Sequence, residues 1–176
     1  MKTLIIVGHP DLNHSVINTR WIEELKKYPE EFTVHSLYEA YPKGTAIEVE
    51  KEQQLIEEHG TLILQYPLYW FNCPALLKKW MDDVFTYGWA YGSKGDKMKG
   101  RKIALSISAG MRTDDFTKNG KYGYTLEDLI GPFKMSALYM HSDFKGFHCL
   151  YGAEEAVENT TLEENSKEYI SFIRSL

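Results

Sequence analysis

Residues 61–85 read TLILQYPLYWFNCPALLKKWMDDVF, a short apolar run followed by an aromatic turn and an amphipathic segment. The run Thr61–Tyr66 has the length and apolar character of a strand buried in a parallel sheet. Pro74 suits the first turn of a helix. Beyond it, one helical face collects the apolar residues Leu76, Leu77, Trp80, Met81, Val84 and Phe85. This stretch therefore predicts a strand, a loop and a helix in succession.

The same alternation extends along the rest of the chain. Further strands are expected over Thr3–Gly8, Phe32–Leu37, Lys102–Ser108 and Lys145–Tyr151. Further helices are expected over Ser15–Tyr28, Glu48–His59, Thr125–Tyr139 and Thr161–Ile173, the last capped by Thr161 with Glu164 three residues on. Residues 88–100 and 112–124 are expected to be loops. Strands alternating with helices predict an α/β fold, a doubly wound five-stranded parallel sheet with helices on both faces, in a single domain spanning residues 1–176.

Bulk properties exclude several classes of protein. The net charge is −5 and no long basic run occurs, which argues against a nucleic-acid partner. Cys73 and Cys149 lack zinc or CxxC spacing, so unpaired thiols in a reducing cytosol are expected. The chain enters its first strand without a leader pattern, and no stretch of 18 apolar residues occurs. We therefore expect a cytoplasmic protein.

In a doubly wound sheet, ligands bind beyond the carboxyl ends of the strands, so the loops after the first, third and fourth strands matter most. The first loop, Gly8–Ser15, lacks both GxGxxG and GxxxxGK[ST]. It places His9, His14, Ser15 and Asn18 around an expected helix N-terminus, which is a suitable anion site. The simpler interpretation is that Ser15 is only a helix cap.

The second loop, Gln65–Pro74, is called here the aromatic loop. Strand-to-helix turns are normally short and polar, whereas this one is rich in aromatic residues between two prolines. A planar heteroaromatic ligand would explain the composition, because rings stack on flat faces. The alternative is that Trp70 and Phe71 are core or dimer-interface residues.

The third loop, Ser106–Met111, has small residues that allow a ligand to approach the backbone closely. The segment that follows it has the character of an active-site loop and contains Phe116, Lys121, Tyr122 and Tyr124. Asp82 and Asp83 have no further ligand at suitable spacing, so no metal site is expected.

The segment QYPLYWFNCPALLKKWMDDVFTYGWAYG and the opening LIIVGHPDLNHSVIN together resemble the flavodoxin-like NAD(P)H:quinone oxidoreductase family. The similarity runs over nearly the whole chain, through IGPFKMSALYM and the strand after it. The length matches the short bacterial branch, which contains general-stress and potassium-efflux ancillary oxidoreductases. The resemblance implies a flavodoxin-like fold.

The resemblance also assigns cofactor-binding residues. It implies that the first loop holds the flavin phosphate through His9, Ser15, Val16, Ile17 and Asn18. The ring is expected on the aromatic loop, and the third loop is expected to complete the flavin site. The residues concerned are Pro67, Leu68, Tyr69, Trp70 and Phe71 in the aromatic loop and Ser108, Ala109, Gly110 and Met111 in the third loop. Short members imply FMN, with FAD as the alternative.

The activity implied by the resemblance is two-electron transfer from NAD(P)H through the flavin to a quinone, with azo dyes and nitroaromatics as related acceptors. The family's active site is shared across a homodimer. One alternative is a regulatory ancillary subunit associated peripherally with a potassium-efflux transporter in the membrane. Another alternative, a one-electron carrier, is disfavoured by the aromatic loop.

One position departs from the family pattern. Phe116 stands where the mammalian members have a tyrosine, and their histidine has no clear counterpart. A phenyl ring cannot donate a proton. The candidates for the proton donor are therefore Tyr122, Tyr124 or a bound water molecule.

Overall fold

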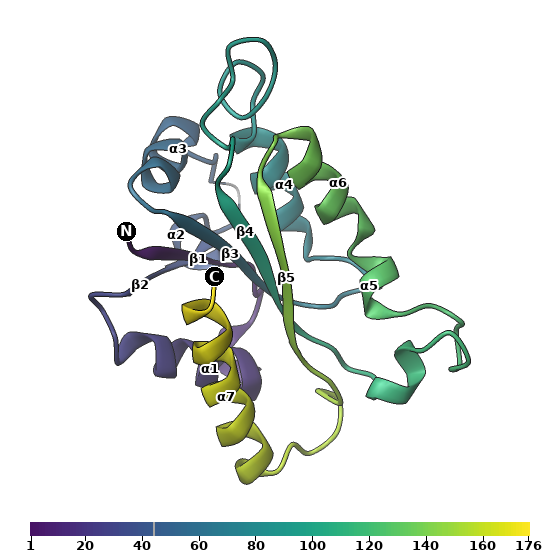
Figure 1. The fold of residues 1–176 in the computed structure, drawn as a ribbon. Coiled ribbons are helices and arrows are strands. Elements are labelled where there is room, and N and C mark those ends of the chain that lie inside the picture. The colour runs from purple at the N-terminus through teal and green to yellow at the C-terminus, as the bar shows by residue number, and fades with distance from the viewer. Residues whose placement is uncertain (44) are drawn as a thin grey trace.

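The computed structural model describes residues 1–43 and 45–176. Within that part of the chain the sheet has five strands, which lie in the order β2-β1-β3-β4-β5 and are all parallel (Figure 1). The strands are β1 (Thr3–Val7), β2 (Phe32–Ser36), β3 (Thr61–Pro67), β4 (Lys102–Ser108) and β5 (Asp143–Leu150). The expected doubly wound sheet is confirmed, and the strand order reverses between β1 and β3.

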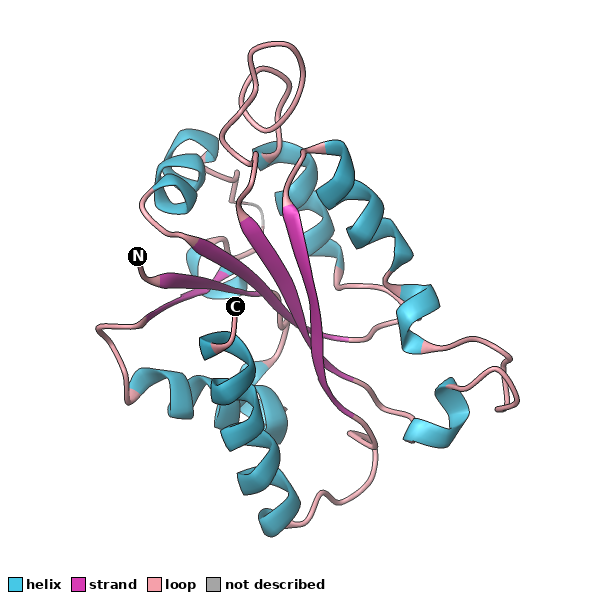
Figure 2. Cartoon of the chain, in the orientation of Figure 1, coloured by secondary structure: helices cyan, strands magenta, loops and turns pink. Residues whose placement is uncertain are grey.

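Helices pack on both faces of the sheet (Figure 2). One face is covered by α1 (Val16–Lys26) and α7 (Asn159–Arg174). The other is covered by α2 (Leu37–Ala40), α3 (Val49–Glu57), α4 (Ala75–Val84), α5 (Leu126–Leu129) and α6 (Gly131–Tyr139). Two short 3₁₀ turns, η1 (Leu12–His14) and η2 (Thr113–Phe116), lie in loops. No helix in the described part of the chain is both long and apolar enough to cross a bilayer.

The central strands are apolar on both sides because each side faces a layer of helices. In β1, Ile5 and Val7 pack with the α1 and α7 layer, whereas Leu4 and Ile6 pack with the opposite layer. All four side chains are completely buried. The continuous apolar run in the sequence thus reflects burial on two faces.

Two expected elements differ in the structure. The strand expected over Phe32–Leu37 ends at Ser36, and Leu37 begins the one-turn helix α2. The helix expected over Thr125–Tyr139 is divided at Ile130 into α5 and α6. Pro132 is the reason, since it has no N–H for an interior helical bond but fits the first turn of α6.

The prediction of Thr161 as the capping residue of the last helix was also wrong. Helix α7 begins at Asn159 after Glu158, whose side chain makes no capping hydrogen bond. Thr161 therefore lies inside the helix. In addition, η2 occupies part of the segment that was expected to have no regular structure, and β5 begins at Asp143, before Lys145.

A buried carboxylate ties the helices of one layer together. Glu52 of α3 is 1% exposed and accepts hydrogen bonds from the Tyr41 hydroxyl (2.6 Å) and the Trp80 indole N–H (2.8 Å). Its Oε1 also lies 2.9 Å from His35 Nε2. Burial alone would raise the pKa of Glu52, but the hydrogen bonds from His35, Tyr41 and Trp80 lower it overall. The ionised carboxylate is therefore a structural link between β2, α3 and α4.

We expect Glu52→Ala to lower the free energy of unfolding by about 3 kcal/mol, because two buried donors lose a charged acceptor. Urea denaturation would measure the change. Glu50→Ala, an exposed position on the same helix, is the matched control and should stay within about 0.5 kcal/mol of the parent. Equal effects of the two substitutions would contradict a special role for the buried carboxylate.

Candidate functional site

Two adjoining cavities lie at the carboxyl edge of the sheet, where the loops after β1, β3, β4 and β5 meet. They share Leu68, Tyr69, Gly110 and Glu154 in their walls. This edge includes the point where the strand order reverses, which is the usual ligand position in such sheets. The aromatic loop and the first loop, far apart in sequence, are thereby brought together.

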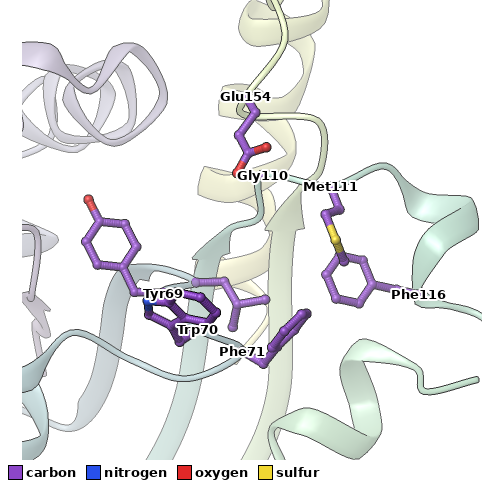
Figure 3. A pocket seen from close by; sticks show the side chains of 8 residues that line it. Tyr69, Trp70, Phe71, Gly110, Met111, Phe116 and Glu154 are labelled. Atoms are coloured by element: carbon purple, nitrogen blue, oxygen red, sulfur yellow. The ribbon is translucent and has the colours of Figure 1, made fainter. Parts of the chain in front are cut away.

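The first of these, called here the aromatic cavity, has a volume of about 370 Å³. In Figure 3, Tyr69, Trp70 and Phe71 lie on one side, and Met111 and Phe116 lie on the other. Glu154 reaches toward Gly110 from the segment after β5. The lining is Leu68, Tyr69, Trp70, Phe71, Gly110, Met111, Phe116 and Glu154. An apolar, aromatic cavity with one carboxylate suits a flat ligand with a polar edge.

The aromatic loop forms a tight turn in an unusual backbone conformation. The Tyr69 N–H donates to the Asn72 carbonyl (2.8 Å) and the Asn72 N–H donates to the Tyr69 carbonyl (2.9 Å). Between them, Trp70 has φ = 49° and Phe71 has φ = 61°, a region that residues other than glycine rarely occupy. Trp70 is 94% exposed, so packing within this chain does not hold it there. Trp70 is therefore not a core residue of the single chain.

Replacing Trp70 by Asn should stabilise the isolated chain by roughly 0.5–1 kcal/mol, because Asn tolerates positive φ and little packing is lost. Chemical denaturation measures the gain. Tyr124→Asn removes an exposed aromatic residue without a positive φ and serves as the control, for which no gain is expected. A loss of stability in Trp70→Asn would show that the turn is not strained.

The second cavity, of about 650 Å³, lies at the N-terminus of α1 and is called here the helix-end cavity. Ser15 caps α1, accepting the Asn18 N–H at 3.3 Å, and the N–H groups of Val16 and Ile17 precede the first intrahelical bond. The predicted residues in its wall are His9, Ser15, Val16, Ile17, Pro67, Leu68, Tyr69, Ser108 and Gly110. Free N–H groups, a hydroxyl and imidazoles are donors that suit a phosphate.

The two histidines of this cavity differ in environment. The Asp11 N–H donates to His9 Nδ1 at 3.0 Å, and burial lowers the pKa of His9. His9 is therefore a neutral imidazole that can donate through Nε2. His14 is exposed, and its Nδ1 lies 2.7 Å from the Asp11 carboxylate. Among the residues that line either cavity, none is Lys or Arg.

Two predicted cofactor-binding residues do not line either cavity. Asn18 is fully buried, and its side chain bonds to Ser15, Gln65 and Ser108. Ala109 is also fully buried; its N–H donates to the Leu150 carbonyl and its carbonyl accepts the Ala153 N–H, both at 2.9 Å. Both residues lie behind the cavity walls and support them, and neither faces a cavity.

Phe116 and the two candidate proton donors, Tyr122 and Tyr124, occupy different positions. Phe116 lines the aromatic cavity and is nearly buried. Tyr122 lines neither cavity, but its ring packs edge-on against Phe71, which lines the aromatic cavity, with centroids 5.6 Å apart. Tyr124 is 60% exposed and is not part of the cavity wall. The geometry thus brings Tyr122, but not Tyr124, beside the site.

The segment after β5 supplies site residues that the sequence did not indicate. Glu154 lines both cavities, and a Cβ built on Gly110 would lie 2.6 Å from its Oε1. Glu155 forms a two-bond ion pair with Arg112 (2.6 and 3.1 Å) across the rim. The segment carries no motif, and its position at the end of a parallel strand was the one available signal.

The fold and the paired cavities define a flavodoxin-like protein. The model of a family described as having the flavodoxin-like fold, Flavodoxin_2, matches residues 1–173, and the chain belongs to this family. A relative from Bacillus subtilis (strain 168), named as the uncharacterized NAD(P)H oxidoreductase YrkL, is 44% identical over 164 residues, covering 91% of this chain and 93% of the relative. The potassium-efflux system ancillary protein KefG of Yersinia pestis (strain Pestoides F) is 32% identical, covering 99% and 94%.

Solved structures agree with this assignment. The general stress protein 14 of Treponema denticola, determined in complex with FMN, is 41% identical, has a TM-score of 0.94 and covers 99% of both chains. An NADPH-quinone reductase from P. pentosaceus is 27% identical with a TM-score of 0.88, covering 98% of this chain and 97% of the other.

Proposed function

We propose that this protein is an FMN-dependent NAD(P)H oxidoreductase that delivers two electrons to quinones or related acceptors. The observation that carries the proposal is the junction of an aromatic cavity with a donor-rich helix end where the strand order reverses. The names of YrkL and the P. pentosaceus reductase, and the FMN complex of the Treponema protein, support it.

The residues present fit FMN. The ring would lie in the aromatic cavity against the aromatic loop and the backbone at Gly110 and Met111. The phosphate would lie in the helix-end cavity, held by Ser15, the N–H groups of α1 and His9. Bound FMN supplies the hydride chemistry, and the chain supplies orientation and exclusion of water.

The charges around the helix-end cavity favour FMN over FAD. Three acidic residues, Asp11, Glu154 and Glu155, line it without any Lys or Arg. One phosphate group can be served by the helix end and the histidines. The nearby Arg112 is already paired with Glu155, so a second phosphate and its nucleotide would meet this acidic rim without a free cationic partner, which is electrostatically unfavourable.

We also propose a homodimer whose active site lies at the interface. In the single chain, Trp70 and Phe71 of the aromatic loop are exposed, as are Met135, Leu138 and Tyr139 of α6. Exposed apolar groups of this size are typical of interaction surfaces. A partner subunit over Trp70 would close the open side of the aromatic cavity.

The KefG relative favours a second candidate function, an ancillary subunit of a potassium-efflux transporter. The alignment with that relative covers 99% of this chain, so the fold gives no reason to prefer one function over the other. Copurification with a membrane transporter would support this role, and it is compatible with flavin binding.

The first test is the flavin content and turnover of the purified full-length protein. We expect a yellow protein from which FMN is released, which bleaches anaerobically with NADH or NADPH and recovers its colour with a quinone. Protein that binds neither FMN nor FAD would overturn the proposal. Release of FAD instead of FMN would overturn the argument from the acidic rim.

Tyr122 is proposed as the proton donor, because its ring lies against Phe71, a residue that lines the aromatic cavity. Tyr122→Phe should lower kcat for quinone reduction by roughly a hundredfold without changing FMN affinity, since loss of a general acid affects only the chemical step. Tyr124→Phe is the matched control and should retain the parent rate. If both variants turn over like the parent, a bound water molecule is the donor.

A further inference from the structure

A chain of buried polar side chains runs behind the helix-end cavity. Tyr169 of α7, Gln65 of β3 and Asn18 of α1 are each 0% exposed. The Tyr169 hydroxyl donates to Gln65 Oε1 at 3.0 Å, and Gln65 Nε2 donates to Asn18 Oδ1 at 3.2 Å. Buried polar groups require hydrogen-bond partners, and these three side chains, from three different elements, supply them to one another.

The direction of these hydrogen bonds is fixed by the backbone. Gln65 Nε2 also lies 3.3 Å from the main-chain carbonyl oxygen of Asn18. A carbonyl oxygen only accepts, so the Gln65 atom facing it must be the NH₂ group. The same NH₂ group faces Asn18 Oδ1, which must therefore be the acceptor. The Asn18 NH₂ group is left to face the other way.

That NH₂ group meets two serines of the cavity wall. Asn18 Nδ2 donates to Ser15 Oγ at 3.1 Å and to Ser108 Oγ at 2.9 Å. Ser15 Oγ accepts the Asn18 main-chain N–H as well. Each hydroxyl has a single hydrogen, and with Asn18 occupying the acceptor side that hydrogen is free to donate elsewhere. Both serines line the helix-end cavity, so their hydrogens are available to a ligand there.

We propose that Asn18 is a positioning residue that sets the hydroxyls of Ser15 and Ser108 as donors toward the helix-end cavity. It makes the cavity selective for a group that presents only acceptor atoms, such as a phosphate monoester. Donors oriented before binding need no reorganisation when the anion arrives. The proposal rests on the proposed flavin function. It gives Asn18 an indirect role in place of the predicted direct contact with the ligand.

Asn18→Asp reverses the hydrogen bonds to Ser15 and Ser108 with almost no change of side-chain shape. One carboxylate oxygen still accepts from Gln65, but the other replaces a donor with an acceptor, so Ser15 and Ser108 turn their hydrogens inward. We expect FMN to bind roughly a hundredfold more weakly at pH 8, equivalent to the loss of two hydrogen bonds to a charged group. Riboflavin, which lacks the phosphate, should lose less than roughly tenfold at the same pH.

Asn18→Leu separates the effect of the lost hydrogen-bond donor from the effect of the added negative charge in Asn18→Asp. It removes the NH₂ donor without adding a carboxylate, so Ser15 and Ser108 are no longer oriented, and FMN should bind roughly tenfold more weakly. Asn13→Asp adds the same charge at an exposed position of the first loop and should change FMN affinity less than roughly threefold. Dissociation constants are measured by flavin fluorescence, and unfolding midpoints of the apo forms check folding.

Gln65→Leu offers a second route if the Asn18 variants do not fold. The apolar side chain removes the NH₂ group that holds the Asn18 amide in its orientation, so Ser15 and Ser108 are no longer held as donors. The same preferential loss of FMN over riboflavin is expected, although Gln65 lines neither cavity.

The outcomes separate the two proposals. If the parent protein does not bind FMN, the proposed function fails. The positioning role alone fails if the parent binds FMN but folded Asn18→Leu binds it equally well. It also fails if FMN and riboflavin weaken to the same extent in Asn18→Asp.

Discussion

The parallel pairing of β1 with β3 is the constraint on which the site depends. Their register places Val7, the last residue of β1, opposite Gln65, two residues before the end of β3. The Gly8 N–H donates to the Gln65 carbonyl at 2.8 Å, directly beyond the end of β1. A Cβ at Gly8 would lie 2.8 Å from the Leu77 Cβ, so a larger residue would push α4 away. Close packing at this point holds the first loop beside the aromatic loop.

Much of the fold could be predicted from local patterns. The strands β1, β3 and β4 are largely apolar runs, and Ser15 has the position of a helix cap in both sequence and structure. Errors occurred where one residue decides between neighbouring outcomes. Pro132 is compatible with a kinked helix or with the first turn of a new one, and the sequence pattern alone does not distinguish the two. The cap of α7 was missed because Glu158 makes no side-chain bond that a sequence pattern could reveal.

The site was predictable to the level of loops, but not of individual side chains. The first and aromatic loops follow strands and have unusual composition, so the prediction that ligands meet there could be made. A sequence motif does not reveal which of its residues face the cavity. Asn18 and Ala109 lie within predicted loops or next to them, yet they are buried behind the walls. Glu154 depends on a contact with Gly110 that is distant in sequence, so no local pattern could indicate it.

The segment after β5 is attached to the third loop through its main chain. The Gly152 N–H donates to the Met111 carbonyl (2.8 Å) and the Ala153 N–H to the Ala109 carbonyl (2.9 Å). Such bonds are insensitive to side-chain identity, so Glu154 and Glu155 can mutate without loss of the wall that carries them. Substitutions in this segment can therefore change the charge and shape of the pocket between paralogues, while the fold that carries the segment stays the same.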